Sequence, residues 1–222
     1  PGNRYSAMLR LGFSLGRNPV THAPFMAQPG MAPGGAVAVR AFEDANGNHR
    51  FEPGETTLEG VEFDTGSLTA RTGTDGVAVI GQLGDGKPVH LRLNAESLPD
   101  IALAPQRPGV EIVPRPGRIH VSEFAIDTLG EIEGTARFGE SRQAVTGLVL
   151  LLVDSRGKPA ARARTASGGV FLFEQLHPGE YRVQLEPGQA GRLGLRLATE
   201  PVVRIGADAR LAKLDLQVLK AP

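Results

Sequence analysis

The sequence predicts an all-β protein built from two tandem β-sandwiches, and three observations lead to this fold class. The 222 residues include 29 Gly and 17 Pro, a content that requires many turns and disfavours long helices. Short segments with strand-like alternation lie between clusters of these turn residues. A set of residues also recurs at one fixed offset of 93 positions, so the chain reads as a duplicated module.

The repeated residues follow the frame R-T-x-x-x-G-V-x-x-x-x-Q-L-x-x-G, first from residue 71 and again from residue 164. They are turn glycines and strand residues, with no acid, base or nucleophile among them. The repeat therefore informs on fold rather than on activity. The matched residues are Arg71, Thr72, Gly76, Val77, Gln82, Leu83 and Gly86 in the first copy, and Arg164, Thr165, Gly169, Val170, Gln175, Leu176 and Gly179 in the second.

The length allows two domains of about 100 residues, each able to bury a modest core. We expect an N-terminal strand and linker over 1–35, a first sandwich over 36–129 and a second over 130–222. Because the chain starts at Pro1 without a Met, we expect it to be a piece of something longer.

Residues 4–15 alternate between apolar side chains and mostly polar ones. This pattern suits one strand of an outer-membrane barrel, which needs about 9–11 residues per span. It suits equally a half-buried strand on a soluble sandwich, and both interpretations stay open. The Gly- and Pro-rich stretch 16–35 that follows is expected to be a linker or an extended crossing segment.

Strand patterns then succeed one another in two sets of seven, divided by Gly, Pro, Asn and Asp clusters. Seven short strands per module indicate an immunoglobulin-like or prealbumin-like sandwich. Residues 95–100 could form one helical turn, and the continuously apolar 147–153 should be a central strand. The expected strands are 36–42, 60–64, 67–72, 76–80, 88–93, 110–113 and 117–127, then 131–138, 147–153, 160–166, 169–174, 180–186, 201–205 and 209–219.

Composition excludes several classes of function. The formal net charge is zero and the basic residues are scattered, which with no Trp and two Tyr argues against a nucleic-acid partner. The absence of Cys removes disulfides, zinc thiolate sites and Cys nucleophiles. No apolar run approaches the ~20 residues of a membrane helix.

One loop has the spacing of a metal site. Counting from Asp44, oxygen-bearing side chains occupy positions one, three, five, nine and twelve of 44–55, which is the pattern of an EF-hand-type calcium loop. Position seven of such a loop donates its backbone carbonyl. The expected ligands are Asp44, Asn46, Asn48, Arg50 through its carbonyl, Glu52 and Glu55.

Position six of this loop departs from the pattern, because His49 stands where Gly usually permits a sharp turn. A non-Gly residue at positive φ costs on the order of 1 kcal/mol. With few carboxylates, we expect a weak Ca²⁺ site of about 10⁻⁴–10⁻³ M, suited to a compartment outside the cytosol. The alternative is a hydrophilic loop without metal, because Asn and Asp favour turns in any case.

With its calcium loop, the first module resembles the calcium-binding B-type repeats of bacterial surface proteins. Part of the second resembles the carboxypeptidase regulatory-like domain, whose fold is a prealbumin-like sandwich. Together the resemblances cover about residues 36–187. The residues that carry them are 39–55, 58–61 and 74–76 in the first module, and 153–157, 169–173 and 178–181 within 147–185.

The order of segments resembles the C-terminal end of outer-membrane usher-like proteins, which pass pilus subunits through a barrel. This looser likeness rests on the arrangement of barrel-like strand, linker and two sandwiches, and on the Pro-Arg-Pro-Gly stretch at 114–117. Some B-type modules carry a Lys–Asn cross-link. The second module contains no Asn, and the only Lys of the first is Lys87 in a turn, which argues against this bond.

The remaining motifs give no good catalytic candidate. Residues 81–87 match seven positions of a phosphate-binding loop, but Pro88 replaces the magnesium-binding hydroxyl and a strand pattern follows, so we expect a hairpin. The five histidines show no metal-ligand pair spacing. Glu131 and Glu133 share one face of a strand, where a solvated face is the commoner outcome than a catalytic pair.

The sequence therefore favours a non-enzymatic, extracytoplasmic structural or protein-interaction module, in the periplasm, outer membrane or cell surface. The expected partner is a pilus subunit or a surface protein, with attachment to the outer membrane through the N-terminal segment. The alternative is a carbohydrate-binding or accessory module of a secreted enzyme, although the usual sugar-stacking aromatics are scarce. A third option is a regulatory segment of a membrane transporter or receptor.

Overall fold

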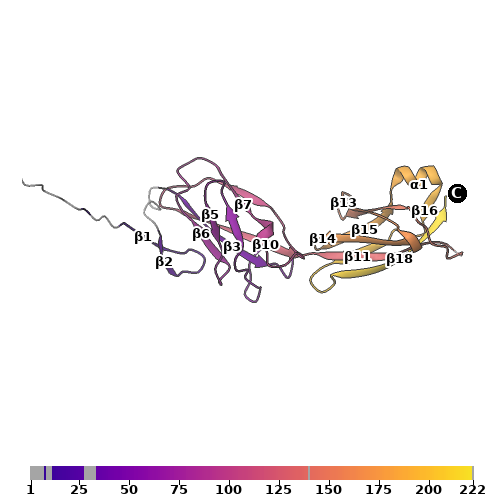
Figure 1. The fold of residues 1–222 in the computed structure, drawn as a ribbon, viewed down its shortest axis with the longest axis horizontal. Helices are drawn as coiled ribbons and strands as arrows, with labels where there is room; N and C mark the ends of the chain where they lie inside the picture. The colour runs from indigo at the N-terminus through magenta and orange to yellow at the C-terminus, as the bar shows by residue number, and fades with distance from the viewer. Residues whose placement is uncertain (1–7, 9–11, 28–33, 140, 222) are drawn as a thin grey trace, which may run out of the picture. The chain divides into compact units, whose positions relative to one another are not determined.

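The computed structural model describes residues 8, 12–27, 34–139 and 141–221 of the chain. These residues form two compact units that are almost entirely β-structure, as predicted (Figure 1). The first unit contains the described residues up to Phe42, with Arg50–Pro99 and Arg107–Ala125. The second contains Glu43–His49, Asp100–Gln106 and the residues from Ile126 onward. The domain limits 36–129 and 130–222 stay a prediction.

The first sequence repeat forms two four-stranded sheets. The 3₁₀ turn Ala95–Ser97 lies within the predicted helical turn. Residues 103–105, 126–128 and Glu43 of these sheets belong to the second compact unit. One sheet has the order β6 (Val77–Ile80), β3 (Ala36–Glu43), β10 (Ile119–Thr128), β8 (Leu103–Pro105), and the other the order β5 (Thr69–Arg71), β4 (Glu62–Asp64), β7 (Val89–Leu93), β9 (Gly109–Ile112).

The second sequence repeat has the same strand order, so the duplication predicted from the sequence is present in the fold. A 3₁₀ turn (Ser167–Gly169) precedes β14, and one short helix, α1 (Pro187–Leu193), follows β15. One sheet has the order β14 (Val170–Leu176), β11 (Gly130–Phe138), β18 (Leu211–Lys220), β16 (Leu195–Leu197), and the other the order β13 (Pro159–Arg164), β12 (Val149–Asp154), β15 (Gly179–Leu185), β17 (Val202–Ile205).

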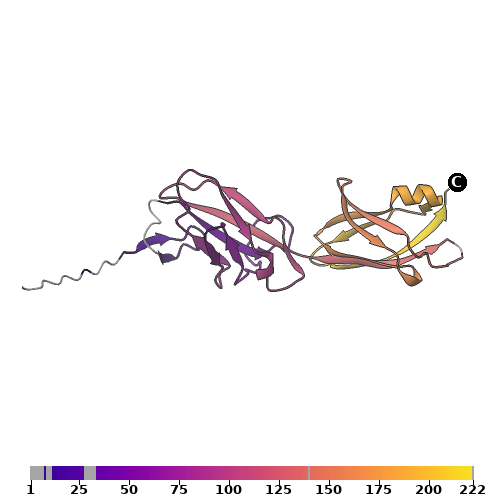
Figure 2. The ribbon, with the colours of Figure 1, turned by 45° about the horizontal axis from the view of Figure 1, so that its top comes forward.

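In each repeat the first and last strands are neighbours that run in the same direction. β11 and β18 pair in parallel and lie side by side in both ribbon views (Figures 1 and 2). β3 and β10 are adjacent too, and Ala36 and Asp44 donate their N–H groups to the carbonyl oxygens of Arg118 and Ile126 at a constant offset. Strand β10 passes into β11 through Leu129 alone.

Aromatic pairs mark the centre of each sandwich. Phe171 and Phe173 meet edge to face at 5.9 Å between ring centroids in the second repeat, and Phe63 and Phe124 meet at 4.8 Å in the first. The predicted central strand 147–153 corresponds to β12, whose Leu150 and Leu152 are fully buried. Burial of such side chains at about 25 cal/mol per Å² is the main stabilising term.

The repeated sequence positions have matching structural roles. Thr72 and Thr165 are buried, and their Oγ1 atoms accept the N–H groups of Val61 and Leu148 at 2.9 and 2.8 Å. Gln82 and Gln175 both adopt positive φ, 58° and 55°. A side chain at Gly76 or Gly169 would collide with the carbonyl oxygen of the strand alongside, so only Gly fits these turns.

Several connections differ from the sequence predictions. The turns 73–76 and 81–88 join strands of opposite sheets, so the hairpin expected over 81–87 is wrong. The short strands β8 and β16 were not predicted, because three residues are too few to show a period. The helix α1 was not predicted either, and its seven residues include Pro187, Gly188 and Gly191, which are typical of turns.

The N-terminal region contains a hairpin where the sequence predicts the start of a linker. β1 (Ser14–Arg17) pairs with β2 (Pro24–Ala27), and the Asn18 side chain closes the turn by accepting the N–H of Val20 at 2.9 Å. Most of the predicted strand 4–15 lies outside the described residues. Within the part of the chain that is described, no helix is long and apolar enough to cross a membrane.

Replacing Thr165 by Val should lower the free energy of unfolding by about 1–3 kcal/mol, because the buried N–H of Leu148 loses its acceptor while the shape of the side chain is kept. Thr72→Val should lower the free energy of unfolding in the same way, because the N–H of Val61 loses its acceptor. The exposed Thr146→Val serves as the control and should change stability little. Equilibrium denaturation measures all three, and equal effects at Thr146 and Thr165 would contradict the assignment.

Candidate functional site

The predicted calcium loop begins directly after β3 with a backbone that coils tightly. Gly47 and His49 adopt left-handed φ values of 75° and 64°. His49 therefore occupies the conformation that position six requires, although its side chain disfavours it. The division between the compact units runs through this loop, with 43–49 in the second unit and the residues from Arg50 in the first.

Asp44 organises the first half of the loop. It is buried, and its Oδ1 accepts the N–H of Gly47 at 2.7 Å while Oδ2 accepts the N–H of His49 at 2.8 Å. The Nδ1 atom of His49 lies 3.4 Å from the same Oδ2. Asn46 adds a smaller turn, since its Oδ1 accepts the N–H of Asn48 at 2.9 Å. Asn46 and Asn48 are exposed at the surface.

The second half of the loop is held within the first unit. Glu55 accepts the N–H of Glu52 through Oε2 at 2.9 Å, which joins positions nine and twelve. The Phe51 ring meets Phe42 of β3 edge to face at 5.5 Å between centroids, and the guanidinium of Arg40 lies 4.1 Å from its centroid. Its N–H points to the carboxylate of Glu123 at 3.4 Å. Arg50 and Glu52 are exposed, and Glu55 is half-buried.

The calcium site stays a prediction on this geometry. Among the described residues, no group of three or more His, Cys, Asp or Glu side chains could hold a metal ion. Besides the carboxylates of Asp44, Glu52 and Glu55, the expected site uses two Asn side chains and a backbone carbonyl, which are ordinary Ca²⁺ ligands. The residue types and the turns of the loop fit that ion, while Asp44 already accepts several N–H groups.

Asp44 belongs to a buried polar cluster that the sequence did not reveal. The Nε2 atom of Gln106 donates to Asp127 Oδ1 at 2.7 Å and lies 3.2 Å from Asp44 Oδ2, so one amide bridges two buried carboxylates. The Nδ1 atom of His177 lies 2.8 Å from Asp127 Oδ2. Tyr181 donates its hydroxyl to the carbonyl oxygen of His177 at 2.7 Å. All five residues belong to the second unit.

The electrostatics of this cluster follow from its burial. The hydrogen bond to Asp127 raises the pKa of His177 above its ordinary value of 6.5, against the opposing effect of partial burial. Burial raises the pKa of Tyr181, with further contributions from Asp127 and Asp154. Asp44, Gln106, Asp127 and His177 contact one another across sequence separations of 21 to 62 residues, so no local motif could identify these partners. The only sign of this cluster in the sequence was His177, which precedes the Pro178-Gly179 turn.

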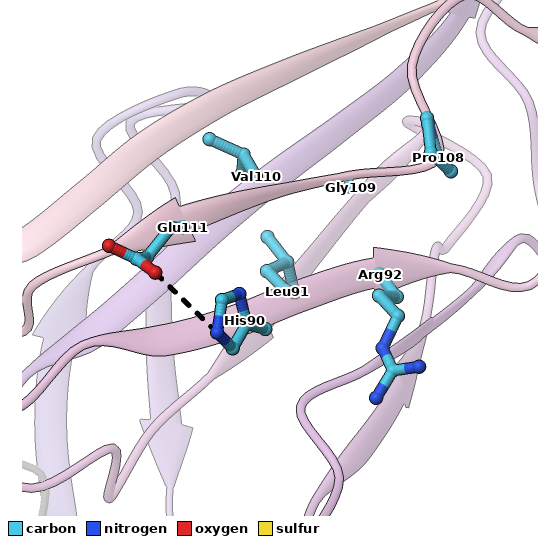
Figure 3. Close-up of a pocket in the computed structure, with 7 residues that line it drawn as sticks. All are labelled: His90, Leu91, Arg92, Pro108, Gly109, Val110 and Glu111. Atoms are coloured by element: carbon cyan, nitrogen blue, oxygen red, sulfur yellow. Dashed lines mark ion pairs between the residues drawn. The ribbon is translucent and has the colours of Figure 1, made fainter.

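Outside this cluster, the described surface carries a hollow and separate ion pairs. A shallow hollow of about 420 Å³ lies over β7 and β9 in the first unit (Figure 3). His90 and Glu111 point toward each other across these strands, 3.5 Å apart, while Arg92 extends further along β7. Glu133, weighed as half of a carboxylate pair, instead binds Lys213 at 2.8 Å.

Comparisons with known proteins give only distant structural likenesses. No family model and no curated protein matches the chain. Among solved structures, the chain is similar to the Bacillus anthracis TIE protein, with 17% identity, a TM-score of 0.38, and coverage of 85% of this chain and 34% of that one. It therefore spans about a third of the TIE protein's length.

Two pilins also show similarity. GBS52, the minor pilin of Streptococcus agalactiae, has 15% identity and a TM-score of 0.43, over 85% of this chain and 97% of that one. A streptococcal ancillary pilin has 15% identity and a TM-score of 0.40, over 96% and 76%. At TM-scores this low the likeness carries no argument about function.

The His177–Asp127 pair should make stability depend on pH. Because the folded-state pKa of His177 is raised, its contribution is fully present below the unfolded value near 6.5 and is lost as pH rises through the folded pKa. Melting temperature measured from about pH 5 to pH 9 should show this loss. His177→Gln and Asp127→Asn should both abolish this contribution.

Tyr181→Phe is the matched control for this cluster. It removes the hydroxyl that binds the His177 carbonyl but leaves the imidazole and its carboxylate partner in place. It should lower stability without flattening the pH profile. A profile in His177→Gln identical to that of the unmodified chain would show that the ion pair has no energetic weight.

Proposed function

We propose that this chain is a non-enzymatic structural and protein-interaction module of an extracytoplasmic protein, stabilised by calcium at the 44–55 loop. One observation carries the proposal: the buried cluster around Asp44 and Asp127 has a structural role. Asp44 and Asp127 accept hydrogen bonds from donors of the chain itself, and these bonds hold a loop, a strand end and a turn together. Buried carboxylates are stable only with such partners.

The order of segments supports a narrower proposal, namely the C-terminal part of an outer-membrane usher-like protein in pilus assembly. In that setting the partner is a pilus subunit or another surface protein, and the N-terminal segment provides attachment to the outer membrane. Two sandwiches follow the N-terminal segment, with Leu129 as the only residue between β10 and β11, and this order is the one on which the proposal rests.

Calcium is proposed to stiffen a loop that already folds without the ion. Side-chain oxygens of Asp44, Asn46, Asn48, Glu52 and Glu55 and the carbonyl of Arg50 would supply the ligands. Support comes from the coiled backbone, in which positions four and six are left-handed, and from the Glu52–Glu55 contact. Because the loop already has its own hydrogen bonds, we expect the gain from the ion to be modest.

A few millimolar Ca²⁺ should raise the melting temperature and a chelator should lower it. With a dissociation constant of about 10⁻⁴–10⁻³ M, mass action stabilises the folded chain by about 1–2 kcal/mol. Glu55→Gln should reduce this gain because position twelve loses its carboxylate. Glu96→Gln, an exposed acid in the 3₁₀ turn, is the control and should retain it. Coincident melting curves in calcium and in chelator would show that the loop holds no ion.

His49→Gly tests the same site with a change that should strengthen calcium binding rather than weaken it. Glycine relieves a left-handed φ of 64° that costs on the order of 1 kcal/mol for other residues. It also removes the imidazole that lies 3.4 Å from Asp44 Oδ2. The relief of φ should stabilise the loop with and without the ion, whereas loss of the imidazole leaves Asp44 Oδ2 more available to calcium. Calorimetric titration should therefore show tighter calcium binding than in the unmodified chain. Weaker binding would mean that His49 itself supports the site.

The location and the partner class can be tested in the source cells. An antibody raised against the chain should detect it in envelope fractions after cell fractionation, with a cytosolic enzyme as the marker of contamination. Affinity electrophoresis in polysaccharide gels should leave its mobility unchanged, because sugar-stacking aromatics are scarce. Detection in the cytosolic fraction would contradict the proposed location, and retardation by a polysaccharide would favour the carbohydrate-binding alternative.

A further inference from the structure

We propose that the second unit bears tensile load, with β11 and β18 acting as a mechanical clamp. These first and last strands of the repeat pair in parallel over eight consecutive register positions, from Glu131 with Leu211 to Phe138 with Val218. The pairing joins the strand by which the chain enters the repeat to the strand by which it leaves. This role goes beyond the proposed function and requires neither calcium nor a partner.

The direction of the strands decides how tension acts on the pair. In a parallel pair, the chain enters β11 at the Glu131 end and leaves β18 at the Val218 end, which are opposite ends of the ladder. Tension along the chain therefore slides one strand past the other. Each ladder hydrogen bond is worth only about 1 kcal/mol net, but sliding loads the evenly spaced bonds together. Resistance to forced unfolding depends on this barrier rather than on equilibrium stability.

Side chains reinforce the same two strands on their outer face. The Lys213 ammonium binds Glu133 at 2.8 Å, and the Thr135 hydroxyl donates to Asp215 at 2.7 Å. Both contacts join register partners, so they lie directly across the ladder that tension would shear. Such exposed contacts contribute little to equilibrium stability, which leaves resistance to sliding as the property they affect most.

The inner face and the sheet position oppose separation as well. Ile132 and Ala136 of β11 and Leu216 and Val218 of β18 are buried in the core. A Cβ atom at Gly134 would collide with the carbonyl oxygen of Leu214, so the absence of a side chain there permits the close approach of the strands. Both strands are central in the order β14-β11-β18-β16, and neither can peel from an edge.

Single-molecule pulling in two directions tests the clamp. The chain has no Cys, so handles can be attached at engineered Cys pairs on the 222-residue chain, with the first unit outside the tether. Glu131→Cys with Lys220→Cys applies shear, whereas Glu131→Cys with Leu211→Cys pulls on register partners and unzips one position at a time. All three positions are exposed.

We expect the shear pair to unfold at a severalfold higher force than the unzipping pair at the same loading rate. Adding Thr135→Val and Lys213→Met to the shear pair should lower its unfolding force, because both side-chain contacts are lost. Glu200→Ala removes an exposed contact with Gln184 elsewhere in the unit and should leave the force unchanged. Equilibrium denaturation verifies that each variant is folded.

Equal forces in the two pulling directions would overturn the proposal, since the ladder would then offer no special resistance to shear. An equal fall in force from Glu200→Ala and from the double substitution would overturn it too. That result would mean that the unfolding force depends on the overall stability of the second unit and not on the β11–β18 ladder. Neither outcome bears on the location or calcium binding of the protein, so failure here is distinguishable from failure of the proposed function.

Discussion

The pairing of the first and last strands of each repeat is the constraint on which the rest of the structure depends. In the second repeat β11 and β18 form the centre of one sheet, and in the first β3 and β10 have the same place. An outward side-chain contact crosses each pair, between Thr135 and Asp215 at 2.7 Å and between Arg40 and Glu123 at 3.6 Å. Parallel strands need a long connection, which here is the remainder of the repeat. Pairing of the first and last strands therefore brings the two ends of the repeat together and encloses the remaining strands in one sandwich.

The same pairing positions the loop that distinguishes the repeats. Asp44 extends the β3–β10 ladder by donating its N–H to the carbonyl oxygen of Ile126 at 3.0 Å. Its side chain is thereby buried beside Gln106, which in turn reaches Asp127. Two carboxylates in a poorly hydrated site repel each other unless donors lie between them. The amide of Gln106 and the imidazole of His177 supply those donors, so the loop and the 177–179 turn are energetically linked through one cluster.

The sequence predicted the fold well because its signals were local. Turn glycines such as Gly76 and Gly169 mark positions where the chain approaches a neighbouring strand, and the fixed offset between them identified the duplication. The left-handed turn at His49 was likewise predicted from the loop spacing. The sequence did not predict features that depend on contacts between residues far apart in the chain. The sheet to which β6 or β7 belongs, and the contact of Asp127 with His177, leave no trace in a window of a few residues.

The relation between the loop and its proposed ion follows from the same contacts. A loop that needs metal to fold leaves its carboxylates without other partners, and removal of the ion then unfolds it. Asp44 instead accepts N–H groups of Gly47 and His49, and Glu55 accepts that of Glu52. Each acceptor contact reduces what an ion can add, because the same oxygens are shared. Calcium binding at this loop is therefore expected to adjust a structure that already exists, with the backbone hydrogen bonds carrying the larger part of its stability.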